Sequence, residues 1–349
     1  MEKSLSILNG TQEDAVRAFT DAGIPAFRAR QVWSWANKGA DYPEMSNLPL
    51  SLRGSLSERF PLRLPRVYKK LVSNIDGTVK YLFSLYDGQL IESVVMKYEH
   101  GYSICISCQA GCRMGCRFCA STLKGLERNL EPCEMLGQIA VAQRDLGVRI
   151  SNVVMMGIGE PMDNYDNVIR FLRLVNKQDG LGIGYRHISV STCGVADGIT
   201  KLMNENMPIT LSVSLHFTDD KSRSDMMPVN NKWNIDTLLQ ACRDYFAKTG
   251  RRISFEFTLI RGKNDTPGNA AALAALLKKY MGGMPLHVNL IPVNEVKERG
   301  LSASETSSVN TFRDTLTKLG VNATVRRKLG SDINASCGQL RYNERKISE

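Results

Sequence analysis

The chain contains 349 residues, about two to three times the usual length of a domain, so we expect one large domain with an appendage or two domains. Hydrophobic residues make up 43% and charged residues 23% of it, which excludes a disordered, collagen-like or coiled-coil protein. The 45 Lys and Arg residues outnumber the 35 Asp and Glu residues, giving a net charge of +10. This surplus favours a polyanionic partner, with nucleic acid ahead of an anionic membrane surface.

The sequence also indicates the compartment. No stretch approaches the roughly 20 uninterrupted apolar residues that span a bilayer. The first residues lack the basic, apolar and small-residue order of a signal peptide. We therefore expect a cytoplasmic protein that does not contact a membrane. Nine cysteines, an odd number for a reducing compartment, argue against a disulfide framework and leave metal binding or thiol chemistry as their purpose.

Residues 1–62 predict a small helical N-terminal accessory domain. Thr11, followed closely by two acidic residues, resembles a helix start, and Gly23 can end that helix. Apolar residues then recur at helical spacing over 26–39, and a third helix is expected over 50–60.

Residues 63–98 change to the period of strands. Alternating runs are separated by turn sequences at 74–77 and 87–88, both of which end in Asp-Gly. This pattern predicts a short antiparallel β-meander as a linking region.

Residues 99–340 form the main body, in which short apolar runs alternate with helical stretches of about 10 to 15 residues. We expect strands at 102–107, 152–159, 187–192, 209–216, 253–260, 287–293 and near 322–326. The alternation predicts a parallel α/β sheet, either doubly wound or rolled into a full or partial barrel. In either fold, functional residues gather at the carboxyl ends of the strands. Residues 341–349 form a basic C-terminal tail.

The cysteines cluster after the first strand of this body. Cys112, Cys116 and Cys119 have the spacing C-x3-C-x2-C, and Gly111 and Gly115 allow the backbone to fold around a bound group. A four-iron cluster held by three cysteines leaves its fourth iron open to a substrate or cofactor. The hypothesis is therefore that these three cysteines hold a four-iron cluster whose open iron binds a substrate or cofactor.

A structural zinc site is the alternative for this loop. Zinc takes four ligands, usually arranged as two separated pairs, so three cysteines in one loop fit it poorly. A fourth ligand from Cys105, Cys108 or Cys133 would make such a site possible.

The C-x3-C-x2-C loop after the first strand of a parallel α/β body resembles the signature of radical S-adenosylmethionine enzymes. Further segments resemble the RlmN/Cfr family of RNA methyltransferases within that superfamily. They read CISCQAGCRMGCRFCASTLKGLERNL, VVMMGIGEPMDN, HISVSTCG, SLH, HVNLIPVN and DINASCGQL, in this order along the chain. The resemblance implies a partial (β/α)6 radical SAM barrel with a small helical N-terminal domain, which agrees with the elements expected above.

The resemblance also implies an activity. Members of the family methylate C2 of an adenine, at adenosine 2503 of 23S rRNA and adenosine 37 of certain tRNAs. The hydrogen on C2 is not acidic, so an ordinary polar methyl transfer fails and a radical route is needed. The implied cofactors are a [4Fe-4S] cluster and two S-adenosylmethionine molecules per turnover. The implied partners are 23S rRNA, tRNA and a flavodoxin-like reducing electron donor, and we expect a monomer.

Matching of the motifs assigns the residues around the cofactors. Cys112, Cys116 and Cys119 would ligate the cluster. S-adenosylmethionine would be held by Gly159, Glu160, Ser191, Ser214, Leu215, His216 and Asn294. The alternative for residues 157–162 is a dinucleotide-binding glycine loop, but its third glycine would fall on Met162. Glu160 is therefore interpreted as an acceptor for the ammonium group of the cofactor.

Three further residues correspond to the family's catalytic groups. Cys337 would be methylated first, because a thiolate is a suitable nucleophile for a sulfonium methyl group. A second cofactor molecule would give a 5′-deoxyadenosyl radical that takes hydrogen from this methyl group, and the resulting methylene radical would add to adenine C2. Cys105 would then release the RNA by forming a disulfide with Cys337, and Glu92 would accept the proton. Cys108 is an alternative partner for Cys337.

Basic residues lie beside the expected chemistry. They are Arg113, Arg117, Lys124, Arg128, Arg326, Arg327 and Lys328, and we expect them to meet the phosphate backbone of RNA. Two alternative functions remain: a Cfr-type C8 adenine methyltransferase, against which Pro161 argues, and a non-catalytic zinc-stabilised RNA-binding protein.

Overall fold

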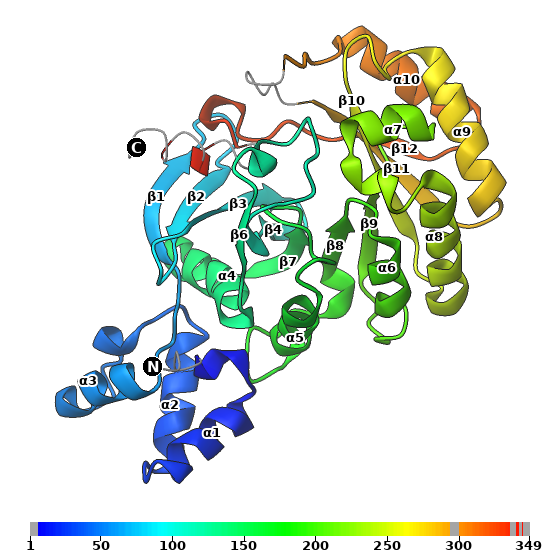
Figure 1. Ribbon diagram of the computed structural model, residues 1–349. Helices are drawn as coiled ribbons and strands as arrows, with labels where there is room; N and C mark the ends of the chain where they lie inside the picture. Colours follow the sequence, from blue (N-terminus) through cyan, green and yellow to red (C-terminus); the bar gives the residue numbers. More distant parts are fainter. Residues whose placement is uncertain (1–5, 294–299, 336–339, 342–343, 345–349) are drawn as a thin grey trace.

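The computed structural model describes residues 6–293, 300–335, 340–341 and 344. The N-terminal domain contains the helices α1 (Gln12–Asp21), α2 (Ala26–Ala36) and α3 (Leu50–Arg59). At the start of α1, Thr11 and Asp14 form the reciprocal hydrogen bonds of a capping box, as the sequence predicts. The three helices enclose a hydrophobic core of their own and form a group apart from the sheet (Figure 1).

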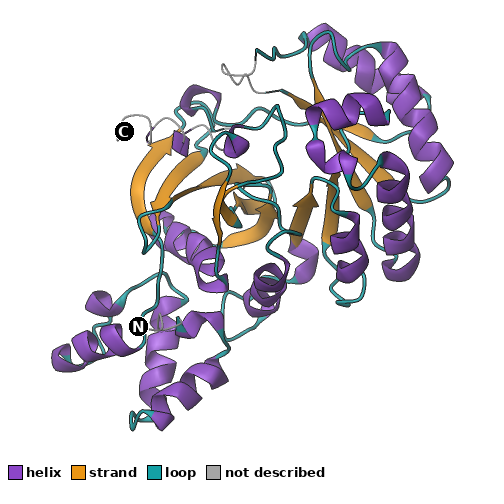
Figure 2. Cartoon of the chain, viewed as in Figure 1, coloured by secondary structure: helices purple, strands orange, loops and turns teal. Residues whose placement is uncertain are grey.

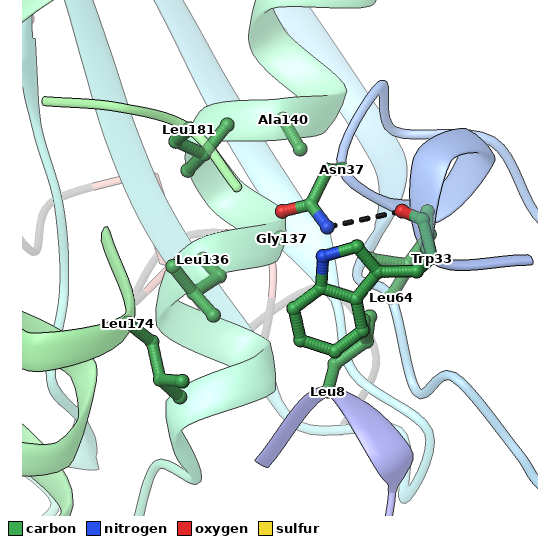
Figure 3. A pocket seen from close by; sticks show the side chains of 10 residues that line it. Leu8, Trp33, Asn37, Leu64, Leu136, Gly137, Ala140, Leu174 and Leu181 are labelled. Atoms are coloured by element: carbon green, nitrogen blue, oxygen red, sulfur yellow. Dashed lines mark hydrogen bonds between the residues drawn. The ribbon is translucent and has the colours of Figure 1, made fainter. Parts of the chain in front are cut away.

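The N-terminal domain is docked on the main body by polar contacts around an apolar junction. The indole nitrogen of Trp33 donates to the carbonyl oxygen of Asp179 at 2.8 Å, and the side-chain amide of Asn9 donates to Glu131 at 2.7 Å. A small cavity lies at this junction (Figure 3), where Trp33 from the N-terminal domain faces Leu136 and neighbouring apolar side chains. Trp33 is buried, so it belongs to this junction rather than to an RNA surface.

Ten strands form one sheet in the described part of the chain, in the order β1-β2-β3-β4-β7-β8-β9-β10-β11-β12. The meander strands are β1 (Arg66–Val72), β2 (Val79–Ser84) and β3 (Leu90–Tyr98), which pair antiparallel. The parallel strands are β4 (Gly101–Cys105), β7 (Ile150–Met155), β8 (Ile188–Thr192), β9 (Thr210–Ser214), β10 (Ile253–Leu259), β11 (Leu286–Pro292) and β12 (Ala323–Val325). Because β3 pairs antiparallel with β4, the meander is continuous with the parallel sheet.

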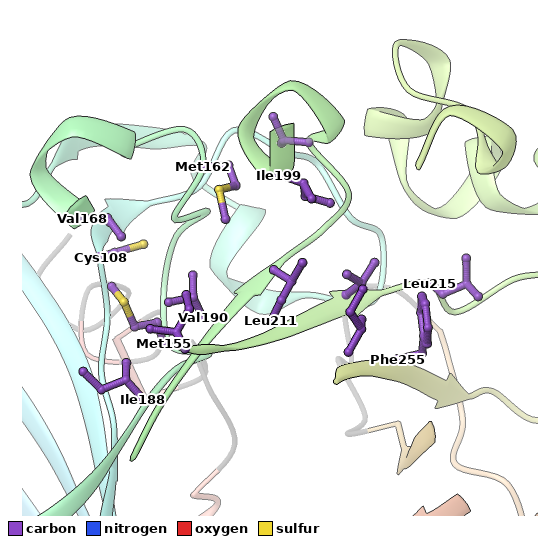
Figure 4. Packing of buried hydrophobic residues seen from close by; sticks show 14 of the residues in the cluster. Cys108, Met155, Met162, Val168, Ile188, Val190, Ile199, Leu211, Leu215 and Phe255 are labelled. Atoms are coloured by element: carbon purple, nitrogen blue, oxygen red, sulfur yellow. The ribbon is translucent and has the colours of Figure 1, made fainter. Parts of the chain in front are cut away.

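Helices connect the parallel strands and cover the outside of the curved sheet (Figure 2). They are α4 (Pro132–Leu146), α5 (Tyr165–Asn176), α6 (Ala196–Leu202), α7 (Asp220–Met226), α8 (Ile235–Thr249), α9 (Pro267–Met281) and α10 (Thr306–Lys318). Side chains of neighbouring strands, including Val190, Leu211 and Phe255, fill the core (Figure 4). Burial of each such side chain stabilises the folded state by about 1.5–3 kcal/mol. The strand order and these covering helices confirm the predicted parallel α/β fold.

Two strands end earlier than the apolar runs suggest. The run 209–216 predicts a strand up to His216, but β9 stops at Ser214 because His216 has a left-handed backbone with φ of 59°. The run 152–159 predicts a strand up to Gly159, but β7 stops at Met155. Gly159 lies in the loop that follows, with φ of 112°. These departures place polar residues on loops at the carboxyl ends of the strands.

Asn294, Cys337 and most of the tail 341–349 lie outside the described residues.

Candidate functional site

The loop that carries the three cysteines is held at its base by a small hairpin. The strands β5 (Gln109–Gly111) and β6 (Leu126–Asn129) pair antiparallel between β4 and α4. Gly111 has φ of 82°, and a Cβ at this position would lie 2.1 Å from the carbonyl oxygen of Gly125. The N–H of Cys112 donates to that same oxygen at 2.9 Å. Only glycine fits at position 111, and it fixes where the cysteine loop (residues 112–119) begins.

The three thiols of the cysteine loop lie within electrostatic range of one another. Burial raises the pKa of Cys112 to about 12 and raises that of Cys116 and Cys119 as well. Negative charge on Cys119 raises the pKa of both Cys112 and Cys116 further. Metal binding would release these protons, because the thiolate is the ligand.

The chemistry of this donor set fits an iron-sulfur cluster. Within the described ranges, no three His, Cys, Asp or Glu side chains are grouped as closely as a single metal ion requires. A four-iron cluster binds each cysteine at a different iron and so spreads its ligands more widely than one ion does. Three buried thiols on one loop can meet that requirement, and all three are free.

The loop after β7 presents a buried carboxylate beside the cysteine loop. A Cβ on Gly159 would lie 2.6 Å from the Cβ of Gln109, so glycine allows this loop to lie against β5. The side-chain oxygen of Gln109 in turn accepts the N–H of Glu160 at 2.9 Å. The carboxylate of Glu160 accepts the N–H groups of Cys193 at 2.7 Å and Met162 at 3.0 Å.

The environment of Glu160 suits an ammonium ligand. Burial raises the pKa of this carboxyl, while hydrogen bonds from the two backbone N–H groups and from the side chains of Thr192 and Cys193 act in the opposite direction. In the part of the chain that the structure describes, no cationic side chain pairs with Glu160. A buried carboxylate that has no cationic partner within the protein can bind a cation that arrives with a ligand.

Arg223 joins the loops that follow β8 and β9. Its fully buried guanidinium donates to the carbonyl oxygens of Cys193 at 2.7 Å, Leu215 at 3.0 Å and Ser214 at 3.1 Å, and to Asn230 at 2.8 Å. Five donors in a fixed plane make this bracing possible, and arginine remains charged even though burial lowers its pKa. No local sequence pattern around α7 predicts this role.

His216 connects the end of β9 to the cysteine loop. Its Nδ1 accepts the N–H of Thr258 at 3.0 Å, so the proton of the neutral ring is on Nε2. The ring meets Phe118 of the cysteine loop edge to face, with 4.9 Å between the ring centroids. Burial, with help from the charge of Arg223, lowers the pKa of His216 to about 3. His216 is therefore a neutral Nε2–H donor at physiological pH.

The remaining residues expected at the cofactor have different environments. Ser191 on β8 and Ser214 at the end of β9 are half-buried. Leu215 is buried in the core, and its N–H donates to the carbonyl oxygen of Glu256. The structure thus brings the loops after β4, β7, β8 and β9 together, and we call this region the cofactor rim.

Glu92 lies on the meander side of the sheet and is buried, although its place in an alternating strand suggests a solvent-facing side chain. One carboxylate oxygen lies 3.1 Å from Nζ of Lys80, and the other accepts the N–H of Arg341 at 2.7 Å. Negative charge on Glu92 raises the pKa of both Cys105 and Cys119, so this carboxylate lies within electrostatic range of both thiols.

Cys105 and Cys108 belong to different hydrophobic clusters. Cys105 is grouped with Val94 and Met96, and Ala335 packs against this small cluster. Ala335 is the last described residue before Cys337. Cys108 is instead part of the main core of the barrel. The structure therefore places Cys105, and not Cys108, beside the described end of the Cys337 segment.

The basic residues near the cysteine loop are paired within the chain. Arg113 pairs with Asp163, and Arg117 pairs with Asp225 at 3.0 Å. Arg128 bridges carboxylates of the β2–β3 turn and of α4. Arg128 is the least exposed of the three, and its two ion pairs join separate parts of the fold. Contact of these residues with RNA phosphates stays a prediction.

A C-x3-C-x2-C loop at the carboxyl end of the first parallel strand of a partial barrel defines a radical SAM protein. The model of the radical SAM superfamily matches residues 106–274. A crystal structure of a radical SAM methyltransferase from Sphaerobacter thermophilus superposes with a TM-score of 0.90 at 39% identity, covering 96% of this chain and 98% of the other.

Curated relatives narrow the class. A Clostridium novyi protein named "Probable dual-specificity RNA methyltransferase RlmN" is 49% identical over 340 residues, which cover 97% of this chain and 98% of the relative. An Alkaliphilus oremlandii protein of the same name is 50% identical over 342 residues, 98% of each chain. The chain belongs to this RlmN family of dual-specificity RNA methyltransferases.

Family membership decides between the functions that the sequence left open. The chain is an enzyme whose cofactors are a [4Fe-4S] cluster and S-adenosylmethionine. A non-catalytic zinc-stabilised protein was therefore the wrong alternative, and the name of these relatives does not favour a Cfr-type enzyme. Among the described residues, no helix has both the length and the apolar character needed to cross a membrane.

Proposed function

We propose that the chain methylates C2 of adenine in RNA, at adenosine 2503 of 23S rRNA and at adenosine 37 of tRNA, through a methyl group carried by Cys337. One observation carries this proposal: the described residues on either side of Cys337 contact the surroundings of the other two proposed catalytic groups. Ala335 packs on the Cys105 cluster, and the N–H of Arg341 is bound to Glu92. The dual-specificity name of the relatives supports two RNA substrates.

The cofactor rim would hold both cofactors. Cys112, Cys116 and Cys119 would bind the cluster, and Glu160 would accept the ammonium of S-adenosylmethionine. Gly159, Ser191, Ser214, His216 and the adjoining Leu215 and Asn294 complete the proposed cofactor contacts. When bound, the cluster and S-adenosylmethionine supply the methyl group and the carbon-centred radical that reaction at C2 requires.

The protein side chains would carry the remaining steps. The thiolate of Cys337 would take the methyl group, and Glu92 would accept a proton during turnover. The thiolate of Cys105 would then attack the sulfur of Cys337, so that a disulfide forms and the bond from this sulfur to the methylene carbon breaks. The electron pair of that bond would stay with the RNA, a proton would complete its methyl group, and a thiol reductant would restore the two cysteines. Burial raises the pKa of Cys105, whereas the charges of Arg326 and Lys80 lower it, and these cations favour the attacking thiolate.

The proposal also extends to the partners of the enzyme. The target adenine must leave its stack to reach the sheet, so recognition would depend on RNA shape and backbone contacts. We propose a flavodoxin-like electron donor, a monomeric state and a cytoplasmic location.

Analysis of the RNA product tests this proposal. The anaerobically reconstituted enzyme is given S-adenosylmethionine, a reductant and either 23S rRNA or tRNA, and the nucleosides are identified by mass spectrometry. We expect 2-methyladenosine from the wild-type enzyme and none from Cys337→Ala, with the cluster intact in both. Cys242→Ala, which removes a buried thiol from α8, is the matched control and should form the product. Formation of 8-methyladenosine, or normal methylation by Cys337→Ala, would contradict the proposal.

A further inference from the structure

The turn between β1 and β2 binds the chain that leads toward Cys337. Asp76 accepts the N–H of Gly330 at 2.8 Å. Asp332 accepts the hydroxyl of Ser73 at 2.7 Å and the N–H of Asn74 at 2.9 Å. These partners lie 254 to 259 residues apart in the sequence. Figure 1 shows the C-terminal segment, in red, passing beside the meander strands.

A buried ion pair continues the same contact deeper in the meander. Lys80, which is completely buried, lies 2.9 Å from the carbonyl oxygen of Asn334 and 3.1 Å from Glu92. Glu92 in turn accepts the N–H of Arg341, and the guanidinium of Arg341 pairs with Glu127 at 2.9 Å. One ion pair therefore reaches the chain both before and after residues 336–339.

The described part of the C-terminal segment is compact where it meets the meander. The N–H of Ala335 donates to the carbonyl oxygen of Gly330 at 3.0 Å. A Cβ on Gly330 would lie 2.6 Å from that of Ala335, so this turn requires glycine, and its φ is 61°. The hydrogen bond from Gly330 also lowers the pKa of Asp76 to about 2, so the acceptor is charged at neutral pH.

A methyl carrier has to reach two places in turn, the cofactor and the RNA base. Holding reacting groups in a fixed geometry can account for a large part of a reaction rate, and a displacement of about 1 Å can cost roughly 100-fold. Charged hydrogen bonds on both sides of a short segment restrict its reach without contacting either reactant. The contacts of Asp76, Asp332 and Lys80 have this arrangement.

We propose that Asp76, Asp332 and Lys80 are positioning residues for the methyl carrier, and that the meander acts as a clamp on the described residues before and after Cys337. The inference rests on the proposed role of Cys337. Asp76 and Asp332 hold the approach to the segment, and Lys80 holds both the approach and, through Glu92, the exit.

The test compares reconstituted full-length enzymes. Asp76→Ala combined with Asp332→Ala removes the turn contacts at sites near the surface, so folding should be retained. Glu99→Ala, which removes an exposed carboxylate from the turn between β3 and β4, is the matched control. The readouts are bound iron, the fraction of Cys337 that carries a methyl group, and kcat and KM for RNA methylation.

We expect the double variant to bind iron normally and to lose about 10-fold in kcat with KM for RNA within about twofold, because a misplaced carrier slows the reaction without weakening binding. Methylation of Cys337 should slow in parallel, and Glu99→Ala should match the wild type. Unchanged kcat and unchanged Cys337 methylation in the double variant would overturn the inference. If the wild type itself formed neither methylated Cys337 nor methylated RNA, the result would contradict the proposed function, and not only the clamp.

Lys80 is tested by replacing its charge in two ways. Lys80→Met should lose about 100-fold in kcat, and Lys80→Arg, which keeps a cation, should recover at least a tenth of the wild-type value. If Lys80→Met and Lys80→Arg lose kcat equally while both fold and bind iron, Lys80 does not act through its charge and its assignment fails. If Lys80→Met does not fold, the double variant of the turn decides the inference.

Discussion

The cofactor rim and the meander clamp are built in different ways. At the rim, neighbouring loops are joined by partners close in the sequence: Glu160 and Cys193 are 33 residues apart, and Arg223 and Ser214 are nine apart. At the clamp, the partners Asp76 and Gly330 are 254 residues apart. The rim therefore forms within consecutive βα units, whereas the clamp forms only when the C-terminal segment returns to the first strands. This difference predicts that the two regions can be damaged separately.

Loss of a cluster ligand should break the rim while leaving the clamp intact. Cys116→Ser should reduce bound iron from about four per chain to less than one and abolish methylation of both Cys337 and RNA, because a three-cysteine site has no spare ligand. Hydrogen exchange at Gly330 should remain as slow as in the wild type, since its partner Asp76 is on the turn between β1 and β2. Iron retention by Cys116→Ser would show that this cysteine is not a ligand.

Removal of Arg223 should weaken the rim as a structure. Arg223→Met leaves several buried acceptors, including the carbonyl oxygens of Cys193 and Leu215, without this donor. We expect a loss of about 3 kcal/mol or more in the free energy of unfolding and about 10-fold weaker binding of S-adenosylmethionine. Denaturant titration and equilibrium binding measure the two effects. Arg243→Met, an exposed position on α8, is the control and should change stability by less than about 0.5 kcal/mol.

As the pH falls, the rim should lose stability before the clamp does. The pKa of His216 is about 3 in the folded protein and 6.5 in an ordinary histidine, so the unfolded chain binds the extra proton between these values. Stability from this group is complete above pH 6.5 and is lost as the pH falls toward 3, by at most about 1.4 kcal/mol per pH unit.

The clamp titrates in a lower window. The pKa of Asp76 is lowered from 3.8 to about 2. Its contribution to the stability of the folded protein is therefore present above pH 3.8 and is lost as the pH falls through 2. The window from pH 7 to 4 therefore tests His216 and not Asp76. The free energy of unfolding should fall over this window in the wild type and fall less steeply in His216→Asn. Asparagine is chosen because it tolerates the left-handed backbone at this position. Equal slopes for the two proteins would contradict the assignment of a neutral His216.

The sequence predicted those features that depend on local patterns. The helical N-terminal domain, the meander and the parallel strands follow from periodicity and turn residues, and Gly111 and Gly115 do have positive φ. The links made by Arg223 and Lys80 were not predicted, because a single cation in a helix or strand gives no signal of which distant carbonyl or carboxylate it meets. The burial of Glu92 depends in the same way on a partner 249 residues further along the chain.

We assign the cofactors to the rim, and the methyl carrier and the RNA step to the meander side of the sheet. The most direct measurement compares Glu160→Gln with Glu92→Gln, quantifying methylated Cys337 and methylated RNA in the same reactions by mass spectrometry. We expect Glu160→Gln to lose both products, whereas Glu92→Gln should form methylated Cys337 but yield less than about a hundredth of the wild-type amount of methylated RNA. Normal RNA methylation by Glu92→Gln, or normal methylation of Cys337 by Glu160→Gln, would contradict it.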